Sequence, residues 1–182
     1  MWWSCLEEVM NHVFWGLLLI FLNFNITIGD SMIGILPDFA GFILIVLGLK
    51  ELVEESAFFT KAILFAKGMV VYSIILYSLD LFGLARTLSW FTTFAGIIAT
   101  IVSLYISYNI IQGILDVEGK YSVDLNGENL LRLWKPLAVL ELLAYVSLLM
   151  PMLAVVFIVA SFVLTIMFMV CFYTTKNNYM QI

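Results

Sequence analysis

Residues 133–174 read LWKPLAVLELLAYVSLLMPMLAVVFIVASFVLTIMFMVCFYT, and this apolar stretch decides the fold. A helix that crosses a bilayer needs about 20 apolar residues. One continuous helix over the whole stretch would be roughly 63 Å long, about twice the hydrocarbon thickness of a membrane. We therefore expect two spanning helices, at 133–150 and 152–174, which meet in a tight hairpin at Pro151.

The composition extends this interpretation to the whole chain. Of the 182 residues, 64% are hydrophobic and 12% are charged, and the mean hydropathy is +1.10. A soluble domain is about half apolar and about a quarter charged, and a chain of this length lacks the interior volume to bury so many apolar side chains. The eight Lys and Arg residues, against 13 Asp and Glu, also leave no basic patch for a nucleic-acid backbone. These numbers exclude a soluble enzyme, a nucleic-acid-binding protein and a disordered linker, and they indicate a protein whose main partner is the lipid bilayer.

Six apolar segments can be counted between the clusters of charged residues. The first two are short and meet in the sequence GDSMIGILPD, at Gly29–Asp38. The connections between the segments are too short to form a further domain. The fold class that we predict is all-α: a single membrane domain over residues 1–182, built as a bundle of six transmembrane helices at 12–29, 33–50, 63–84, 88–112, 133–150 and 152–174.

The distribution of basic residues predicts the orientation of this bundle. With six spans and the N-terminus inside, the only basic residue in an outer turn is Arg86, and the inner segments hold Lys50, Lys61, Lys67, Lys120, Arg132, Lys135 and Lys176. Cytoplasmic segments of membrane proteins are richer in Lys and Arg. The N-terminal region has no basic residue before its first apolar run, so we expect that run to be retained as a helix and not removed as a signal peptide. Both termini are expected in the cytoplasm, and the protein in the plasma (cytoplasmic) membrane.

Residue types that support catalysis or metal binding are scarce. The chain has one histidine, His12, and two cysteines, Cys5 and Cys171, which lie near opposite ends. One histidine cannot build a zinc site with so few partners, and the motifs of zinc proteases and phosphate-binding loops are absent from the sequence. We expect no catalytic residue, no metal and no cofactor, and a protein that is not an enzyme.

An ionisable residue at membrane depth indicates a functional site by default, and Glu141 is the strongest instance. It lies seven residues beyond Trp134, which places it about 10 Å into the membrane. Tyr105 reaches a similar depth on another helix, Asn109 lies somewhat shallower on that helix, and Tyr145 follows Glu141 by one turn. One hypothesis is a polar ligand-binding pocket or a proton-accepting site. The other is a single buried acid that is hydrogen-bonded to these groups and holds the bundle together.

A second group of polar residues gathers at the outer ends of the first two segments, namely Asn23, Asn25, Thr27, Asp30 and Asp38. Short or interrupted spans often mark the binding sites of transporters, so this group is a second candidate for ligand binding. The alternative is a well-capped outer turn. Pro37 suits the first turn of a helix, and Asp38 just after it suits the positive end of the helix dipole.

A third pair of charges lies at the outer end of the segment 63–84. Asp80 occurs in YSLDLFGLAR, and Arg86 follows it in a short turn from which it could fold back. The pair lies near the membrane surface, where an exposed ion pair contributes little energy. A structural ion pair is the favoured interpretation, and a ligand site is the alternative.

Small residues recur at helical spacing in two segments and predict where helices pack. Gly34, Gly41 and Gly48 recur every seven residues, and Ala95, Ala99 and Ser103 recur every four, with Ser107 continuing the second series. Small side chains let helix backbones approach each other, and packing drives the association of helices in lipid. Contact within the bundle is the favoured interpretation, and a dimerisation face is the alternative.

Residues 35–44, ILPDFAGFIL, followed by GLK at 48–50, resemble the LPDF-x-G hairpin motif of small multipass membrane proteins of Gram-positive bacteria. This resemblance covers about the first third of the chain and implies a bacterial membrane protein. In size and helix number alone, the chain is also similar to the six-helix substrate-binding subunits of energy-coupling vitamin transporters. That likeness is an analogy, because no vitamin-specific motif occurs in the sequence.

Two functional hypotheses follow from these observations. The first is a small-solute binding or transport subunit, which is motivated by the interrupted first hairpin and by Glu141. The second is a non-catalytic membrane scaffold or accessory subunit, whose partner would be another membrane protein subunit. A transport subunit should enclose its polar residues around a cavity, whereas a scaffold should bury them in direct pairs.

Overall fold

The computed structural model describes residues 2–21, 25–28, 31–34, 38–81, 89–146 and 151–179. Side chains are described within 8–21, 38–79, 93–145, 156–157 and 159–179. This part of the chain forms six helices and one pair of strands: α1 (Trp2–Phe21), β1 (Asn25–Ile28), β2 (Ser31–Gly34), α2 (Asp38–Lys50), α3 (Ala57–Leu81), α4 (Ser89–Tyr121), α5 (Gly127–Val146) and α6 (Pro151–Tyr179).

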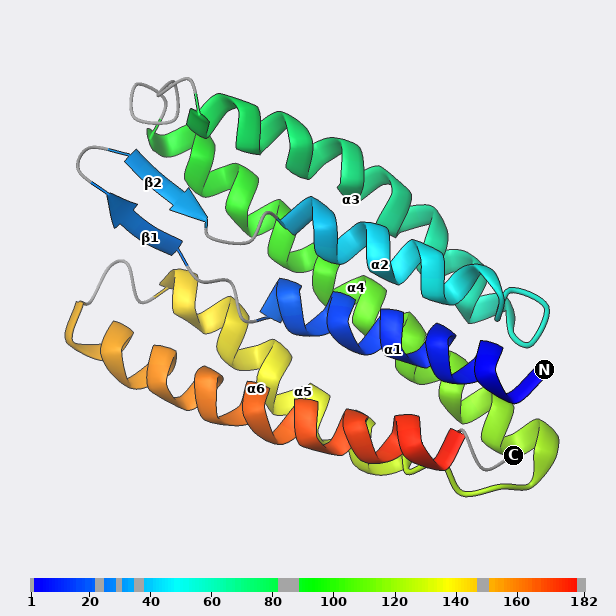
Figure 1. Ribbon diagram of the computed structural model, residues 1–182. Helices are drawn as coiled ribbons and strands as arrows, with labels where there is room; N and C mark the ends of the chain where they lie inside the picture. Colours follow the sequence, from blue (N-terminus) through cyan, green and yellow to red (C-terminus); the bar gives the residue numbers. More distant parts are fainter. Residues whose placement is uncertain are drawn as a thin grey trace.

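The helices pack as a closed ring. Each helix contacts the next one along the chain, and α1 also packs against α6. Successive helices run in opposite directions, so α1 begins and α6 ends at the same end of the bundle (Figure 1). We call this the terminal end, and it also holds the connections 51–56 and 122–126. The β1–β2 pair lies at the opposite end, which we call the hairpin end (Figure 1).

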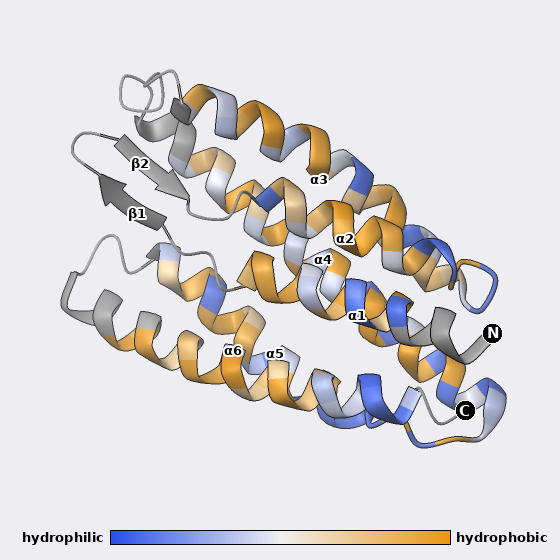
Figure 2. Cartoon of the chain, in the orientation of Figure 1, coloured by the Kyte–Doolittle hydropathy of each residue, from blue (hydrophilic) through white to orange (hydrophobic). Residues whose placement is uncertain are grey.

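Apolar residues dominate the middle of the helices, and hydrophilic residues gather at the terminal end (Figure 2). Three helices are long and apolar enough to cross a membrane, at Ala57–Leu79 in α3, Thr93–Tyr121 in α4 and Val159–Tyr179 in α6. Large apolar side chains cover the outer surfaces of α3 and α6, including Leu64, Val71, Val159 and Val170. These surfaces are suited to contact with a lipid bilayer, as the composition predicts.

The prediction of six spanning helices needs correction, because three of the described helices satisfy the requirements of length and apolarity. α2 has 13 residues and rises only about 20 Å. α5 carries charges at Arg132, Lys135 and Glu141. The described side chains of α1 belong to a shorter apolar stretch, Glu8–Phe21. The prediction of an all-α bundle with six helices is confirmed for the described residues.

The first helical hairpin contains a strand pair that the sequence pattern did not predict. The expected helices at 12–29 and 33–50 would meet directly, but α1 ends at Phe21 and α2 begins at Asp38. Between them β1 and β2 pair antiparallel, with Asn25 opposite Gly34 and Ile28 opposite Ser31. β-Branched residues favour strands, and three follow one another in β1 at Ile26, Thr27 and Ile28. β2 also contacts α3, so the strand pair packs against the helical bundle.

The boundaries of the later helices also differ from the prediction. The segment 88–112 was expected to end nine residues before the observed end of α4 at Tyr121, and α5 begins at Gly127 instead of 133. The connection is short because Glu118 Oε1 accepts hydrogen bonds from the backbone N–H groups of Leu125 (2.7 Å) and Gly127 (2.8 Å). Asn126 adopts a left-handed conformation with φ of 71°, which asparagine tolerates better than most residues. The expected separation of the last two helices at Pro151 is confirmed, since Pro151 is the first residue of α6.

Glycine residues set the contact between α1 and α2. A Cβ atom on Gly41 would lie 2.9 Å from the carbonyl oxygen of Gly16, and one on Gly48 would lie 2.6 Å from the carbonyl oxygen of Val9. Both distances are below normal van der Waals contact, so the two backbones touch only because these side chains are absent. Gly41 and Gly48, for which the sequence predicts a packing role, thus lie where α2 approaches α1. Gly34 was expected on the same helix but belongs to β2.

Aromatic side chains close the ring between α1 and α6. The ring centroids of Phe21 and Phe168 are 5.8 Å apart, and those of Phe14 and Phe172 are 6.4 Å apart. The largest fully buried side chains lie on α1, α2, α3, α4 and α6 and in the connection after α2: Met10, Leu17, Phe42, Ile45, Leu49, Leu52, Phe59, Ile106, Ile110, Ile111, Phe168 and Phe172.

Candidate functional site

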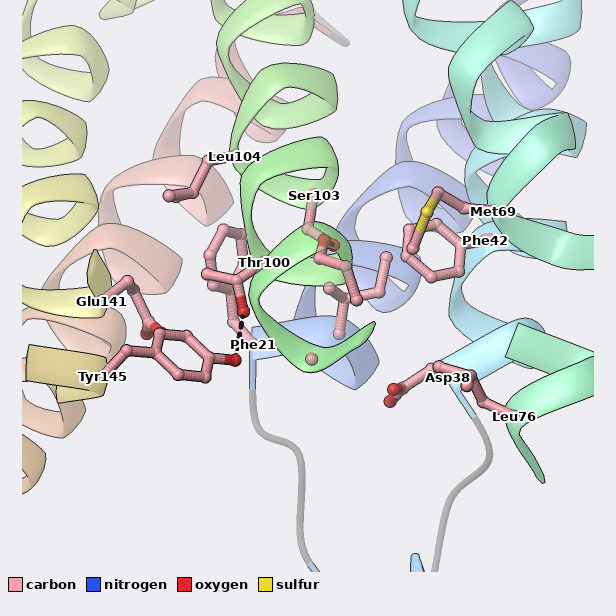
Figure 3. Close-up of a pocket in the computed structure, with 13 residues that line it drawn as sticks. Phe21, Asp38, Phe42, Met69, Leu76, Thr100, Ser103, Leu104, Glu141 and Tyr145 are labelled. Carbon is pink, nitrogen blue, oxygen red and sulfur yellow. Dashed lines mark hydrogen bonds between the residues drawn. The ribbon is translucent and has the colours of Figure 1, made fainter. Parts of the chain in front are cut away.

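A pocket of about 280 Å³ lies in the half of the bundle nearer to the hairpin end. Five helices line it: the last residues of α1, the first residues of α2, and parts of α3, α4 and α5 (Figure 3). Its polar lining residues are Asp38, Thr100, Ser103, Glu141 and Tyr145. The remaining lining residues are apolar or small, so polar and apolar groups share the surface of the pocket about equally.

The two carboxyl groups reach the pocket from different helices. Asp38 is the first residue of α2, and Glu141 lies on α5. In Figure 3 they lie on opposite sides of the pocket, with α4 between them. The sequence assigned these two residues to separate candidate sites, and the fold brings them to one. It does so because the start of α2 and the second half of α5 reach the same level of the bundle.

A hydroxyl pair lies beside Glu141. Thr100 Oγ1 and the Tyr145 hydroxyl are 2.8 Å apart and form a hydrogen bond between α4 and α5 (Figure 3). Gly96 faces this tyrosine, because a Cβ atom there would lie 3.4 Å from the Tyr145 hydroxyl oxygen, at van der Waals contact. Ser103 Oγ donates a hydrogen bond to the carbonyl oxygen of Ala99 at 2.8 Å, which leaves its lone pairs available to the pocket.

The charged side chains among the described lining residues of the pocket are of one sign. All lining residues that belong to the described part of the chain are acidic, hydroxyl-bearing, small or apolar, and none of them is Lys, Arg or His. The charged groups among these described lining residues are the carboxyl groups of Asp38 and Glu141. Within the described residues, no group of three or more His, Cys, Asp or Glu is placed to hold a metal ion.

Two residues that the sequence grouped with Glu141 lie elsewhere. Tyr105 is 40% exposed and packs edge-on against Phe65, with ring centroids 4.7 Å apart. Asn109 is buried, but its Nδ2 donates to the carbonyl oxygen of Tyr105 at 2.7 Å, within the same helix. In the described part of the chain, neither residue forms a hydrogen bond to Glu141. Similar depth did not bring them together, because they lie on α4 at rotations that do not face the pocket.

The other candidates of the first hairpin and the expected ion pair fall on parts that are not fully described. Asn23, Asp30 and Arg86 lie outside the described residues. Asn25 is described by its backbone in β1 and Asp80 by its backbone in α3. The role of the first hairpin beyond Asp38 and the pairing of Asp80 with Arg86 therefore remain predictions.

Small residues of α4 form part of the pocket wall as well as the helix contacts. Ala99 and Ser103 line the pocket, and the carbonyl oxygen of Ala95 accepts a hydrogen bond from the Tyr72 hydroxyl at 3.0 Å. Ser107 continues the series and accepts a hydrogen bond from Trp134 Nε1 at 2.9 Å. The predicted packing stripe is thus the face of α4 that meets α3 and α5.

Several lining residues were missed by the sequence analysis. Gly96 and Thr100 belong to the same small-residue face as Ala99 and Ser103, and the spacing of these four residues is a signal that could have revealed them. The aromatic residues Phe21 and Phe42 carried no such signal, because phenylalanine is common throughout this apolar chain.

Polar residues at the terminal end form direct pairs. Lys120 Nζ donates to Glu55 Oε2 at 2.7 Å, and the Tyr121 hydroxyl donates to the same oxygen at 2.9 Å. The hydrogen bond from Lys120 lowers the pKa of the Glu55 carboxyl below its ordinary value, and the hydrogen bond from Tyr121 acts in the same direction. These contacts tie the α2–α3 connection to the end of α4.

A buried lysine forms a second contact at the terminal end. Lys176 is 8% exposed, and its Nζ donates to Asn11 Oδ1 at 2.6 Å. The same ammonium lies 4.9 Å from the ring centroid of Tyr173 and 5.8 Å from that of Phe14. An ammonium near aromatic faces is attracted by their electrons, so Lys176 helps to close the ring between α6 and α1.

No protein-family model, no curated protein and no solved structure matches the chain. The function of the pocket must therefore follow from its own geometry and chemistry.

Proposed function

We propose that this chain is a multipass membrane protein that binds a small solute in the pocket between α1, α2, α3, α4 and α5, as a binding or transport subunit. One observation carries the proposal: two acidic residues from different helices face one pocket of about 280 Å³ inside an apolar bundle. Ionisable groups in such surroundings are costly to bury and usually mark the path of a substrate or ion.

The proposed setting is a bundle that lies in the plasma membrane of a bacterium, with the terminal end in the cytoplasm. The three long apolar helices support this placement, and we propose that the shorter α1, α2 and α5 are held in the membrane by packing against them. Basic residues support the orientation, because the terminal parts of five helices carry Lys50, Lys61, Lys120, Arg132 and Lys176. The likeness of residues 35–50 to bacterial membrane proteins agrees with this setting.

Native mass spectrometry of the full chain in mild detergent tests the proposal. We expect the wild-type protein to retain a reproducible small-molecule adduct and the variant Gly96→Leu to lose it, because the leucine side chain would occupy the pocket beside Tyr145. The matched control is Gly68→Leu, since Gly68 also lies in a long apolar helix but has no atom within 4 Å of its Cβ position. An adduct that persists in Gly96→Leu, or no adduct in any variant, contradicts the proposal.

A membrane scaffold or accessory subunit is the second candidate function. It is favoured by the direct polar pairs between helices, such as Trp134 with Ser107 and Tyr72 with the backbone of Ala95. These pairs fix the bundle without any ligand. A membrane protein that copurifies with wild type, Gly96→Leu and Gly68→Leu alike, in the absence of any adduct, would support this function instead.

A further inference from the structure

An apolar groove of about 320 Å³ lies where α1 packs against α6. Phe14 forms its α1 side, and Ile166, Met169, Val170 and Tyr173 form its α6 side. These four residues are three or four apart in the sequence, so they occupy one face of α6 over about 10 Å. α6 is one of the three helices that are long and apolar enough to cross a membrane, and Val170 and Tyr173 are exposed. The groove therefore opens on the outer surface of the bundle, which is suited to contact with lipid.

A buried ammonium group lies beside this groove, on the side of the terminal end. Lys176 follows Tyr173 by one turn of α6, and its Nζ lies 4.9 Å from the ring centroid of Tyr173 and 5.8 Å from that of Phe14. Both of these rings line the groove. Lys176 is 8% exposed, and a lysine is rarely buried to this extent unless it is paired. The groove thus combines apolar walls with a positive charge at one end.

The ammonium group of Lys176 has hydrogen-bonding capacity that the described residues do not use. A lysine ammonium has three N–H donors, and its one acceptor in the part of the chain that the structure describes is Asn11 Oδ1, at 2.6 Å. The described contacts of Lys176 are therefore to a neutral amide and to two aromatic rings. Among the described residues, its positive charge has no anionic partner, so an anion from outside the chain can complete its contacts.

We propose that the groove between α1 and α6 binds an anionic phospholipid, with one acyl chain along Ile166, Val170 and Phe14 and the phosphate group at Lys176. This inference goes beyond the solute-binding function, because it rests on the proposed membrane setting and not on the pocket. An apolar groove that ends at a cation matches the two parts of a lipid, its acyl chain and its phosphate. Phosphatidylglycerol has a net negative headgroup, whereas the headgroup of phosphatidylcholine carries a positive charge of its own. Lys176 therefore favours the anionic lipid.

The position of the groove agrees with a headgroup at the Lys176 side. Lys176 lies three residues before the last residue of α6, Tyr179, at the end of the bundle that we propose to lie in the cytoplasm. The cytoplasmic leaflet is the one that carries anionic lipids. Trp15 is 53% exposed and lies beside Phe14, with ring centroids 5.7 Å apart, and tryptophan is enriched where membrane meets water. An acyl chain that starts at Lys176 would run towards Ile166 and the middle of the membrane.

A second apolar groove allows an internal comparison. It lies between α5 and α6, and its described lining residues are all aliphatic: Leu140, Val156, Val159, Ala160, Val163 and Leu164. Val159 in this groove and Val170 in the first are similarly exposed, at 57% and 62%. The second groove offers an acyl chain the same kind of apolar contact without a lysine among its described lining residues. We expect it to accept lipid chains with no preference for the headgroup.

Native mass spectrometry of the full chain in mild detergent tests the headgroup preference. Palmitoyl-oleoyl phosphatidylglycerol and palmitoyl-oleoyl phosphatidylcholine, which have the same acyl chains, are added in equal amounts. We expect the wild type to retain about fivefold more of the anionic lipid, which is the effect of one lysine near an anionic lipid surface, and Lys176→Gln to retain both lipids equally. Lys61→Gln is the matched control and should behave as the wild type. Lys61 also lies over a phenylalanine ring, 5.1 Å from the centroid of Phe58, but it is exposed on α3.

A second pair of variants tests the groove itself. Val170→Phe places a larger side chain in the groove between α1 and α6, and Val159→Phe does the same in the groove between α5 and α6. We expect Val170→Phe to abolish the excess of phosphatidylglycerol and Val159→Phe to leave it unchanged. Circular dichroism and gel filtration show that each variant is folded. If Lys176→Gln does not fold, this pair of exposed substitutions and the comparison of the two lipids on the wild type still decide.

The possible outcomes separate this inference from its alternatives. Equal retention of the two lipids by the wild type, or an excess of phosphatidylglycerol that survives Lys176→Gln or Val170→Phe, overturns the proposal. An equal loss in Lys61→Gln overturns it as well, because it would show a general effect of charge. A dimer that replaces the lipid adduct and is lost in Val170→Phe would assign the groove to a second copy of the chain. Gly96→Leu acts on the solute pocket and is expected to leave the lipid excess unchanged, so a failure of this proposal is distinct from a failure of the proposed function.

Discussion

The acidic side chains Glu55, at the terminal end, and Glu141, in the pocket, differ in their hydrogen bonding. At the terminal end, Glu55 accepts hydrogen bonds from Lys120 and Tyr121, so its charge is satisfied within the protein. In the pocket, by contrast, Glu141 forms no hydrogen bond with any other side chain that the structure describes. A residue that is satisfied in this way contributes to stability, whereas a polar residue that faces a pocket is available to a ligand.

The first prediction at the scale of single residues concerns pH. The pKa of Glu55 is lowered in the folded protein, chiefly by the hydrogen bond from Lys120. A lowered pKa in the folded state means that ionised Glu55 stabilises the fold above its unfolded pKa of about 4.3. This contribution is lost as the pH falls through the lower folded value. Because the pair is partly exposed, the contribution is below about 1 kcal/mol.

The measurement compares thermal unfolding of the wild type and Glu55→Gln in detergent. We expect a lower melting temperature for the variant at pH 7, and a difference that shrinks as the pH falls below about 4.3. Glu54→Gln serves as the control, because Glu54 is an exposed neighbour in the same connection. A difference that grows as the pH falls would contradict the assignment.

The sequence could predict those residues of the candidate site that are ionisable and lie within an apolar segment. Asp38 and Glu141 stand out because an acid within an apolar segment is rare and costly. Tyr105 and Asn109 were grouped with Glu141 by depth alone, yet Tyr105 packs on Phe65 and Asn109 on its own helix. Depth follows from residue count, but the rotation of one helix against another depends on packing that a single apolar sequence does not reveal.

At the scale of elements, glycine residues let the backbones of α1 and α2 approach each other closely. Gly41 and Gly48 face Gly16, Val9 and Val13 with no space for a side chain. The repeat of Gly41 and Gly48 was visible in the sequence, but their partner Gly16 was not, because one glycine in another helix forms no pattern. The β1–β2 pair was missed for a similar reason: four residues per strand are too few to show an alternation within an apolar segment.

This contact makes a prediction about stability. In Gly48→Ala, the new methyl group would lie 2.6 Å from the carbonyl oxygen of Val9 and 2.7 Å from Val13 Cγ2, so the helices must separate. Overpacking of this kind costs about 1–3 kcal/mol. Gly68→Ala is the control, since nothing lies within 4 Å of the added atom, and alanine in an exposed helix gains up to about 1 kcal/mol over glycine.

Thermal unfolding of both variants in the same detergent measures the effect. We expect Gly48→Ala to melt at a lower temperature than the wild type and Gly68→Ala to melt at the same or a higher temperature. If both variants melt alike, α1 and α2 are not in the close contact described.

At the scale of the whole molecule, six helices that alternate in direction place the terminal end and the hairpin end at opposite ends of the bundle (Figure 1). The ring is closed by α1 and α6, through aromatic contacts such as Phe21 with Phe168 and through Lys176 on Asn11. The helix count and alternation were predictable from apolar segments and charges. The sequence did not predict how many of these helices are long enough to span a membrane. One reason is that α2 is shorter than its apolar segment, because part of that segment forms the strand pair.

Cysteine labelling tests the proposed orientation. Ala57 and Ser122 are exposed at the terminal end, so Ala57→Cys and Ser122→Cys are expected to react with a membrane-impermeant maleimide in inverted vesicles and not in intact cells. Ser31→Cys, in β2 at the hairpin end, is expected to show the reverse pattern.

Both native cysteines, Cys5 and Cys171, must be replaced first, so that only the introduced cysteine reacts. Cys5→Ala serves for one, and Cys171→Ser keeps an acceptor for the hydrogen bond that Asn126 Nδ2 donates to Cys171 Sγ at 3.2 Å. Labelling of positions 57 and 122 in intact cells would show that the terminal end faces outward.

The glycine contact between α1 and α2 has a mechanical consequence for the pocket. Two backbones in direct contact at Gly41 and Gly48 can neither slide nor tilt without a clash, so this pair moves as one stiff body with Asp38 at its rim. Around the pocket, the wall formed by α4 and α5 is instead joined by the Thr100–Tyr145 hydroxyl pair, which can exchange its partner for a water or a ligand. A change in the distance between Asp38 and Glu141 would therefore require a shift of α5, because α1 and α2 are held together at Gly41 and Gly48.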